Sequence, residues 1–156
     1  MRNMSGLDGA FLHLETPSTP MHVAVLYLIE PPPAATGDFG SELRRQLLPR
    51  LALAPFFRSR LAPMPLNLAN PVWIDGGIPD FSQHLRHIVL PAAAGFGELE
   101  ACVSGLHSTL LDRQYPLWEL TIIEGLAGGE VALYLKIHHA ALDGVSGMAL
   151  AAALFD

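Results

Sequence analysis

Apolar residues along the second half of the chain fall into runs of strand length. Residues 119–124 and 131–138 are rich in leucine, β-branched and aromatic side chains, and Gly128 and Gly129 lie between the two runs. This order is typical of two antiparallel strands joined by a tight turn. The pattern therefore predicts a hairpin of two antiparallel strands.

Apolar residues at helical spacing indicate elements that would cover this sheet. The clearest case is segment 98–111, whose regularly spaced apolar residues are Leu99, Cys102, Val103, Leu106 and Leu110. Ser41, followed by an early Glu and later Arg residues, favours a helix over 41–53 that Pro55 would end. The other predicted elements are helices at 5–15 and 145–155, strands at 23–29 and 84–90, a loop at 31–40, and an irregular stretch at 54–79 with a brief strand at 72–74. Together they predict one α+β or mixed α/β domain, with helices on a mixed or largely antiparallel sheet.

The composition predicts a surface that contacts something. Only 15% of the residues are charged and 51% are hydrophobic, whereas about 25% charged residues is usual for a soluble domain. A chain of this size has more apolar surface than it can readily bury alone. The expected partners are a further lobe absent from this chain, a second copy of the chain, or a lipid surface.

The net charge and the length of the apolar runs argue against several kinds of function. The net charge of −6 argues against nucleic acid and against purely electrostatic membrane docking. The longest apolar runs are shorter than the 18 to 20 or so residues that cross a bilayer, and Asp8 and Glu15 interrupt the amino-terminal segment. We therefore expect a cytoplasmic protein, with peripheral contact at a membrane or lipid droplet as a further expectation. Cys102 is the single cysteine and is interpreted as a packing residue.

The sequence His138-His139-Ala140-Ala141-Leu142-Asp143-Gly144 ends the last predicted strand. Successive strand side chains point to opposite faces, so His138 and His139 cannot both face one reaction centre while the chain stays extended. One imidazole would take part in chemistry and the other would pack behind it, because neutral histidine accepts a proton near pH 7. Asp143 would form a structural ion pair or cap backbone groups. A purely structural role for the paired histidines is the alternative.

No metal is expected at this motif. Diverging rings on a strand are poor ligands for one zinc ion, and metal-binding helices instead use histidines four residues apart. His107, near the apolar stripe of the predicted helix at 98–111, has no partners at ligand spacing, so we interpret it as a histidine at the edge of the core.

HHxxxDG resembles the signature of the CoA-dependent acyltransferase superfamily, which includes chloramphenicol acetyltransferase and the condensation domains of peptide synthetases. The rest of the chain is similar to the bacterial wax ester synthase/diacylglycerol acyltransferase family. The matching segments, in family order, are Thr19-Pro20-Met21-His22-Val23, Phe57-Arg58-Ser59-Arg60-Leu61, Pro71-Val72-Trp73, His84-Leu85-Arg86-His87, Leu90-Pro91, Leu111-Asp112-Arg113, Pro116-Leu117-Trp118-Glu119 and Ile123-Glu124-Gly125-Leu126. The similarity covers nearly the whole chain and implies the chloramphenicol-acetyltransferase-like fold.

The resemblance implies that His139 is a general base, which deprotonates a diacylglycerol or a long-chain alcohol for attack on acyl-CoA. His138 and Asp143 would hold the geometry of the motif, and Gly144 would permit a tight turn. Acyl-CoA is a substrate here, and no cofactor is implied.

The same resemblance links Pro116, Leu117 and Trp118 to substrate binding or to the shape of an acyl channel, the alternative being a strand entrance with a buried tryptophan. Leu110 stands where the family commonly has proline, and Tyr115 where it commonly has a basic residue. These departures make the substrate preference less transferable than the reaction.

Residues 1–156 are expected to form the amino-terminal lobe of an enzyme whose site lies between two lobes, the second lobe being absent from this chain. The favoured function is an O-acyltransferase making triacylglycerol or wax ester. A non-catalytic half that binds acyl lipid or assists assembly is one alternative. A condensation-type acyltransferase is another, disfavoured because condensation domains lack the surrounding Pro-Leu-Trp and Pro-Met-His-Val matches.

Overall fold

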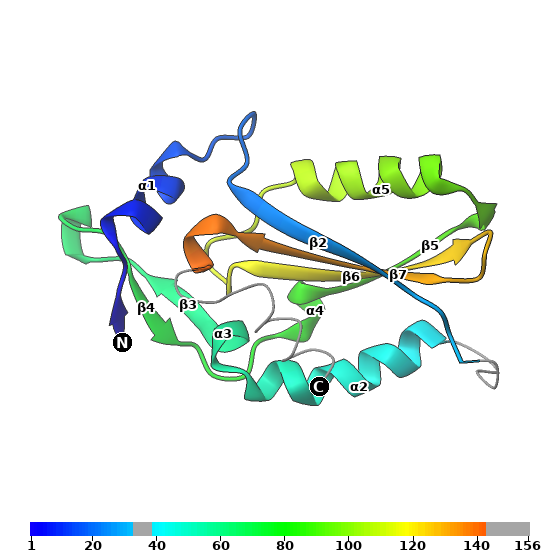
Figure 1. The fold of residues 1–156 in the computed structure, drawn as a ribbon. Coiled ribbons are helices and arrows are strands. Elements are labelled where there is room, and N and C mark those ends of the chain that lie inside the picture. The colour runs from blue at the N-terminus through cyan, green and yellow to red at the C-terminus, as the bar shows by residue number, and fades with distance from the viewer. Residues whose placement is uncertain (33–38, 143–156) are drawn as a thin grey trace.

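The computed structural model describes residues 1–32 and 39–142, and its centre is a four-stranded sheet (Figure 1). The strand order is β2 (His22–Ile29), β7 (Val131–His138), β6 (Trp118–Leu126) and β5 (Leu85–Ala94). β7 pairs antiparallel with both of its neighbours, whereas β5 and β6 are parallel. The sheet is therefore mixed, and the predicted hairpin forms its middle.

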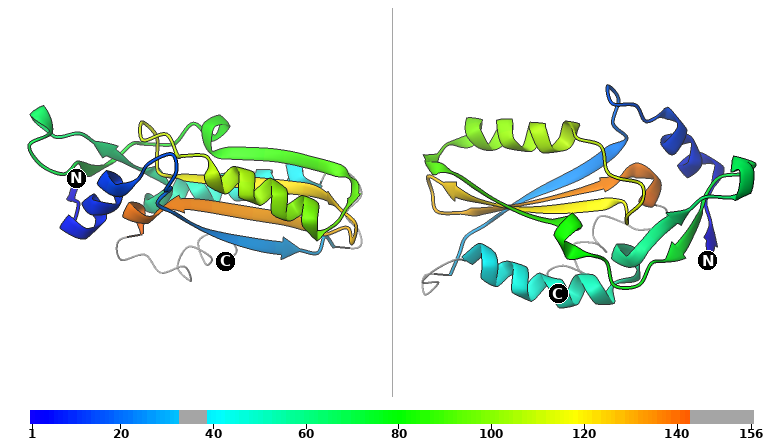
Figure 2. Two further views of the ribbon diagram at one scale, coloured as in Figure 1. Left: turned by 90° about the horizontal axis from the view of Figure 1, so that it is seen from above. Right: turned by 180° about the vertical axis from the view of Figure 1, so that it is seen from behind.

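One helix covers each face of this sheet, α2 (Phe39–Leu53) on one side and α5 (Phe96–Ser108) on the other (Figure 2). Alternate residues of β7 belong to two separate cores. Leu133, Leu135 and Ile137 share a core with Leu47 and Leu51 of α2. Ala132 and Tyr134 share a second core with Leu99 and Leu106 of α5. Because both faces are covered, every residue of β7 is buried, which explains its nearly continuous apolar sequence.

A small second sheet lies at one end of the molecule, close to the end of β7 (Figure 1). Its strand order is β1 (Arg2–Asn3), β4 (Val72–Asp75) and β3 (Ser59–Ala62). The short elements around it are α3 (Pro55–Arg58), η1 (Pro65–Asn67) and α4 (Phe81–His84). Leu61 and Trp73 of this sheet belong to the same core as α2, so the two sheets form one folded unit.

Helix α1 (Gly6–Leu14) packs against the turn that follows β7. The hydroxyl of Ser5 accepts a hydrogen bond from the backbone N–H of Asp8 at 3.1 Å, which caps the first turn. The backbone N–H of Glu15 bonds to the carbonyl of Phe11 and closes the last turn. The predicted helix at 5–15 is confirmed, and its end lies beside the histidine motif.

Two predicted helix boundaries were wrong. α2 begins at Phe39 rather than after a cap at Ser41, since a carboxylate oxygen of Glu124 on β6 accepts the N–H of Gly40 at 3.0 Å. α5 ends at Ser108, so Leu110 and Leu111 lie beyond it. Long-range partners of this kind leave no local sequence signal.

Two further segments differ in part from the expectation. Within 54–79 the predicted brief strand at 72–74 is confirmed as β4, but the stretch also contains α3 and β3, which are not expected because the second sheet pairs strands too short for a clear alternation. His84 ends α4, and the strand predicted at 84–90 starts one residue later and continues to Ala94. The helix predicted at 145–155 lies outside the described residues. Within the described part of the chain, no helix is long and apolar enough to cross a bilayer.

Candidate active site

The two adjacent histidines occupy different environments at the end of β7. His138 is the last strand residue and is fully buried. Its Nδ1 accepts the backbone N–H of Ala140 at 3.0 Å, which starts the short turn η2 (His139–Ala141). His139 is exposed, and its backbone N–H donates to the carbonyl of Met21 at 2.8 Å. The chain stops being extended at His138, and the division between a buried and an accessible imidazole is present as expected.

The ring of His139 stacks on the ring of Phe11 from α1. The ring centroids are 3.9 Å apart and the planes are inclined by 26°. No hydrogen bond joins the ring nitrogens of His139 to any residue within 1–32 or 39–142. The stack therefore restrains the plane of the ring while leaving its nitrogens available to a substrate.

The buried His138 is neutral at physiological pH. Burial lowers the pKa of His138 to about 4, although the nearby Glu15 carboxylate acts in the opposite direction. Because its Nδ1 accepts a hydrogen bond from Ala140, the proton of the neutral ring belongs on Nε2. Nε2 lies 3.3 Å from Oε1 of Glu15, off the line of a regular hydrogen bond, so the contact is mainly electrostatic.

Glu15 is a buried carboxylate with several donors around it. Its side chain is 1% exposed, and Oε2 accepts a hydrogen bond from Arg113 at 2.9 Å. Oε1 accepts the backbone N–H of Met21 at 3.3 Å and lies 3.1 Å from Nε2 of His22. Burial alone would raise the pKa of Glu15, but the hydrogen bonds from Arg113 and from the backbone N–H of Met21 lower it below its ordinary value. Glu15 is therefore a carboxylate at neutral pH.

The Pro116-Leu117-Trp118 segment lies directly beside the motif. The carbonyl of Leu117 accepts the backbone N–H of His138 at 3.0 Å. Trp118 is buried, stacks on His84 with centroids 4.4 Å apart, and donates from Nε1 to the carbonyl of Phe57 at 2.9 Å. These contacts agree with the alternative interpretation of this segment, in which Trp118 is a buried packing residue at the entrance of a strand.

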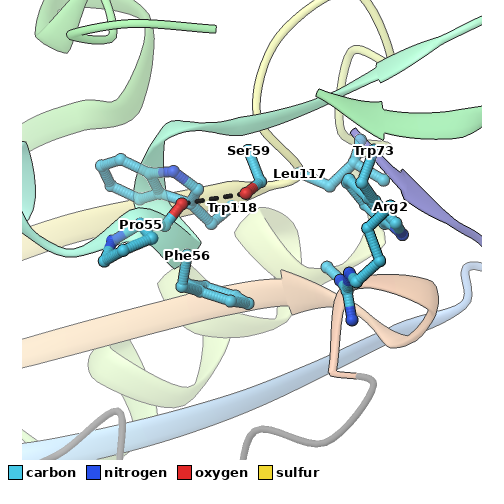
Figure 3. Close-up of a pocket in the computed structure, with 8 residues that line it drawn as sticks. Arg2, Pro55, Phe56, Ser59, Trp73, Leu117 and Trp118 are labelled. Carbon is cyan, nitrogen blue, oxygen red and sulfur yellow. Dashed lines mark hydrogen bonds between the residues drawn. The ribbon is translucent and has the colours of Figure 1, made fainter. Parts of the chain in front are cut away.

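Leu117 and Trp118 also line a cavity of about 220 Å³ (Figure 3). Its other walls come from Arg2 and Trp73 of the small sheet, from the segment around α3, and from Ala141 of the turn that carries His139; the full lining is Arg2, Pro55, Phe56, Ser59, Trp73, Leu117, Trp118 and Ala141. Pro116 instead lines a smaller, more polar cavity beside His84 and Tyr115. The segment therefore contributes to two separate cavities.

Asp143 and Gly144 lie outside the described residues. Sequence reasoning did not single out Phe11, Glu15 or Arg113, although all three surround the motif. Arg113 stood within a segment that matches the family, but Glu15 was considered only as a charge that interrupts an apolar run. No group of three or more His, Cys, Asp and Glu side chains within residues 1–32 and 39–142 is arranged to hold a metal ion.

Comparison with solved structures defines the class of fold. The first condensation domain of the calcium-dependent antibiotic synthetase superposes over 88% of this chain and 32% of its own, with a TM-score of 0.68 at 20% identity. At that identity the likeness shows the fold alone. The fold is the condensation-domain, chloramphenicol-acetyltransferase-like one.

Sequence comparison then gives the family. Residues 4–156 match the wax ester synthase/diacylglycerol acyltransferase catalytic domain, and the chain belongs to this family. A Mycobacterium tuberculosis protein named as a diacylglycerol O-acyltransferase is 43% identical over 94% of the chain and 33% of its own length. A solved wax ester synthase/diacylglycerol acyltransferase from Marinobacter aquaeolei VT8 is 40% identical over 95% of the chain and 37% of its own, with a TM-score of 0.81. The chain spans about a third of the length of these relatives.

Proposed function

We propose that this chain is the amino-terminal lobe of an O-acyltransferase, which moves a fatty acyl group from acyl-CoA to diacylglycerol or a long-chain alcohol. The observation that carries the proposal is the exposed imidazole of His139, held at the end of a buried strand by its stack on Phe11. The family and its named relatives support the reaction class.

His139 would act as the general base. A neutral imidazole takes the proton of the acceptor hydroxyl while the oxygen attacks the thioester carbonyl. The carbon–sulfur bond then breaks, and the CoA thiolate leaves with the proton that the imidazole carries. The products are an ester, triacylglycerol or wax ester, and free CoA. His138 does not compete for the proton, because it is fully buried and its pKa is lowered to about 4 by that burial.

The cavity beside the motif would receive part of the acyl chain. Leu117, Trp118 and Ala141 give it an apolar wall, and Ala141 stands in the same short turn as His139. Its volume of about 220 Å³ is below the 300 to 1,000 Å³ or so that is common for complete ligand sites. A segment of the acyl chain fits there, and the remainder of the substrate requires a further wall.

A second lobe would supply that wall and the donors that stabilise the oxyanion. The relatives are about three times as long as the matched region, which supports a site built between two lobes. An oxyanion donor contributes roughly 3 to 4 kcal/mol to lowering the barrier, so this lobe alone would turn over slowly. Asp143 would hold the geometry of the motif, and Gly144 would permit its turn.

A lipid-binding or assembly half is the second candidate, and the edge strand β2 favours it. Val25, Leu26 and Leu28 on this strand are exposed, Leu28 by 56%. Such a surface also suits peripheral contact with a membrane or lipid droplet, or with a second copy of the chain. A condensation reaction has less support, since those neighbours share only the fold at 20% identity.

The proposal is tested by product analysis. The chain is incubated with palmitoyl-CoA and either dipalmitoylglycerol or hexadecanol, alone and with a separately expressed second lobe of the Marinobacter relative. Tripalmitin or palmityl palmitate formed together with CoA supports the enzyme. Retention of acyl lipid without any ester product in either mixture supports the binding half instead.

A further inference from the structure

We propose that Glu15 is the positioning residue of the site: it fixes the backbone and the neighbouring ring that together place the imidazole of His139. This inference rests on the proposed function, in which His139 is the base. Glu15 does not touch the reacting atoms in this account and acts only through its neighbours.

One carboxylate oxygen reaches both sides of His139. Oε1 of Glu15 accepts the backbone N–H of Met21 at 3.3 Å, and the carbonyl of that same Met21 accepts the backbone N–H of His139 at 2.8 Å. The same Oε1 lies 3.3 Å from Nε2 of His138, the residue that precedes the base. Moving this oxygen would therefore displace both the backbone of Met21, which bonds to His139, and the ring of His138.

Arg113 holds the carboxylate in turn. Its Nη2 donates to Oε2 of Glu15 at 2.9 Å and to the carbonyl of Leu12 at 2.6 Å, so it binds both the side chain and the last turn of α1. Burial lowers the pKa of His22 and of His138, so both rings are neutral at pH 7. Arg113 is then the only described group hydrogen-bonded to Glu15 that carries a full positive charge. A buried carboxylate fixed by one strong charged bond is a rigid reference point.

The segment of α1 and its cap carries both residues that contact the histidine motif, Phe11 and Glu15. Phe11 lies in the last turns of α1, and Glu15 is the residue that caps this helix, with its backbone N–H bonded to the carbonyl of Phe11. Phe11 stacks on the ring of His139, and Glu15 faces His138. One helical segment thus restrains the plane of the base and the backbone that carries it.

Glu15 is poorly suited to be the base itself. Its side chain is only 1% exposed and is already bound by Arg113 and Met21. Its pKa lies below the ordinary value, which makes its carboxylate a weak proton acceptor. A positioning role accounts for the burial and for the contacts on both sides of His139.

The test compares Glu15→Gln with Glu42→Gln in the chain of residues 1–156. Glu42 is an exposed glutamate that bonds to Arg45 at 2.6 Å, so its variant loses an arginine pair away from the site. The chain is labelled with ¹⁵N-histidine and uniformly with ¹⁵N, and the ring signals and backbone amides are assigned. In Glu15→Gln we expect shifts at the rings of His138 and His139 and at the amide of Met21, while the ring of His84 stays in place. Glu42→Gln should leave all of these signals unchanged.

Unchanged signals at His138 and His139 in Glu15→Gln overturn the proposal. Where Glu15→Gln does not fold, Glu15→Asp replaces it, which keeps the charge but shortens the reach by one methylene. In that variant, shifts confined to the motif support the proposal, and equal shifts at His84 contradict it. These signals need no turnover, so they test Glu15 even if the chain proves not to be an acyltransferase.

Where turnover is measured, Glu15→Gln should lower kcat by about 10- to 100-fold, since small misplacements of a catalytic group cost this much. The KM for acyl-CoA should remain within about two-fold of the wild-type value, because Glu15 touches no substrate in this account. A raised KM at unchanged kcat contradicts the positioning role.

Discussion

The imidazole of His139 stacks on the phenyl ring of Phe11, with 3.9 Å between the ring centroids. The amino-terminal helix therefore contacts the motif that follows the last described strand. Since His139 is exposed, this stack is the main restraint on its ring among the described residues.

Phe11→Leu should weaken turnover without unfolding the chain. The variant keeps an apolar side chain but loses the stacked ring, and such ring pairs contribute about 0.5 to 1.5 kcal/mol. We expect kcat to fall by roughly 2- to 10-fold. Phe96→Leu is the matched control, because Phe96 is 72% exposed and is the first residue of α5, which does not carry the motif. Equal rates for Phe11→Leu and the wild type would refute a role for the stack.

Two buried tryptophans give a paired stability test. Trp118 donates from Nε1 to the carbonyl of Phe57, whereas Nε1 of Trp73 is buried and has no hydrogen-bond partner among the described residues. Substitution by phenylalanine removes similar volume from each, but only Trp118→Phe leaves a buried carbonyl unpaired. Trp118→Phe should therefore cost about 1 to 3 kcal/mol more than Trp73→Phe. Urea unfolding of both variants measures the difference, and equal losses would show that the bond contributes nothing.

Lys136 is the single lysine of the chain and is fully buried. Its Nζ donates to the carbonyls of Leu106 and Thr109 at 2.7 and 2.9 Å, at the end of α5. Burial lowers its pKa, yet its lone pair is inaccessible. Acetylation of the folded chain should modify the amino terminus at least about 100-fold faster than Lys136. Mass spectrometry before and after adding urea measures both rates, and native labelling of Lys136 at the rate of the terminus would contradict the fold.

The folded chain should lose stability as the solution becomes mildly acidic. Burial lowers the pKa of His138 from 6.5 to about 4, so between these values the unfolded chain binds a proton that the folded chain does not. The stabilisation is complete above about pH 6.5 and is lost as the pH falls toward 4, by roughly 3 kcal/mol. The pKa values of His22 and His84 are lowered by burial too, which acts in the same direction. Urea midpoints at pH 7.5, 6 and 5 should decrease in that order; constant midpoints would refute the buried, neutral state of these rings.

The sheet could be predicted from the sequence because its strands carry their own signal. The run 131–138 is apolar and β-branched or aromatic, and β7 has these same bounds. The turn after β6 was also visible, since Gly129 adopts a positive φ of 79° that suits glycine. Strand alternation that ends at the motif predicts different environments for His138 and His139, and the structure confirms one buried and one exposed ring.

The surroundings of the motif could not be predicted, because they are long-range. Glu15 and Arg113 meet across most of the chain, and nothing near either residue indicates the other. The first turn of α2 likewise depends on Glu124 from β6, which accepts the N–H of Gly40. Local periodicity carries information about each element, whereas partners of this kind are set only when the elements pack.

The most direct test of the account is CoA release from palmitoyl-CoA with dipalmitoylglycerol or hexadecanol, measured with the second lobe present. It compares the wild type with His139→Ala and with His13→Ala, which removes an exposed histidine of α1. We predict equal rates for the wild type and His13→Ala, at least about a 100-fold lower kcat for His139→Ala, and thermal midpoints within about 5 °C of one another, since His139→Ala loses only the ring stack on Phe11. CoA release by His139→Ala at the wild-type rate, or no release by the wild type in any mixture, would contradict the account.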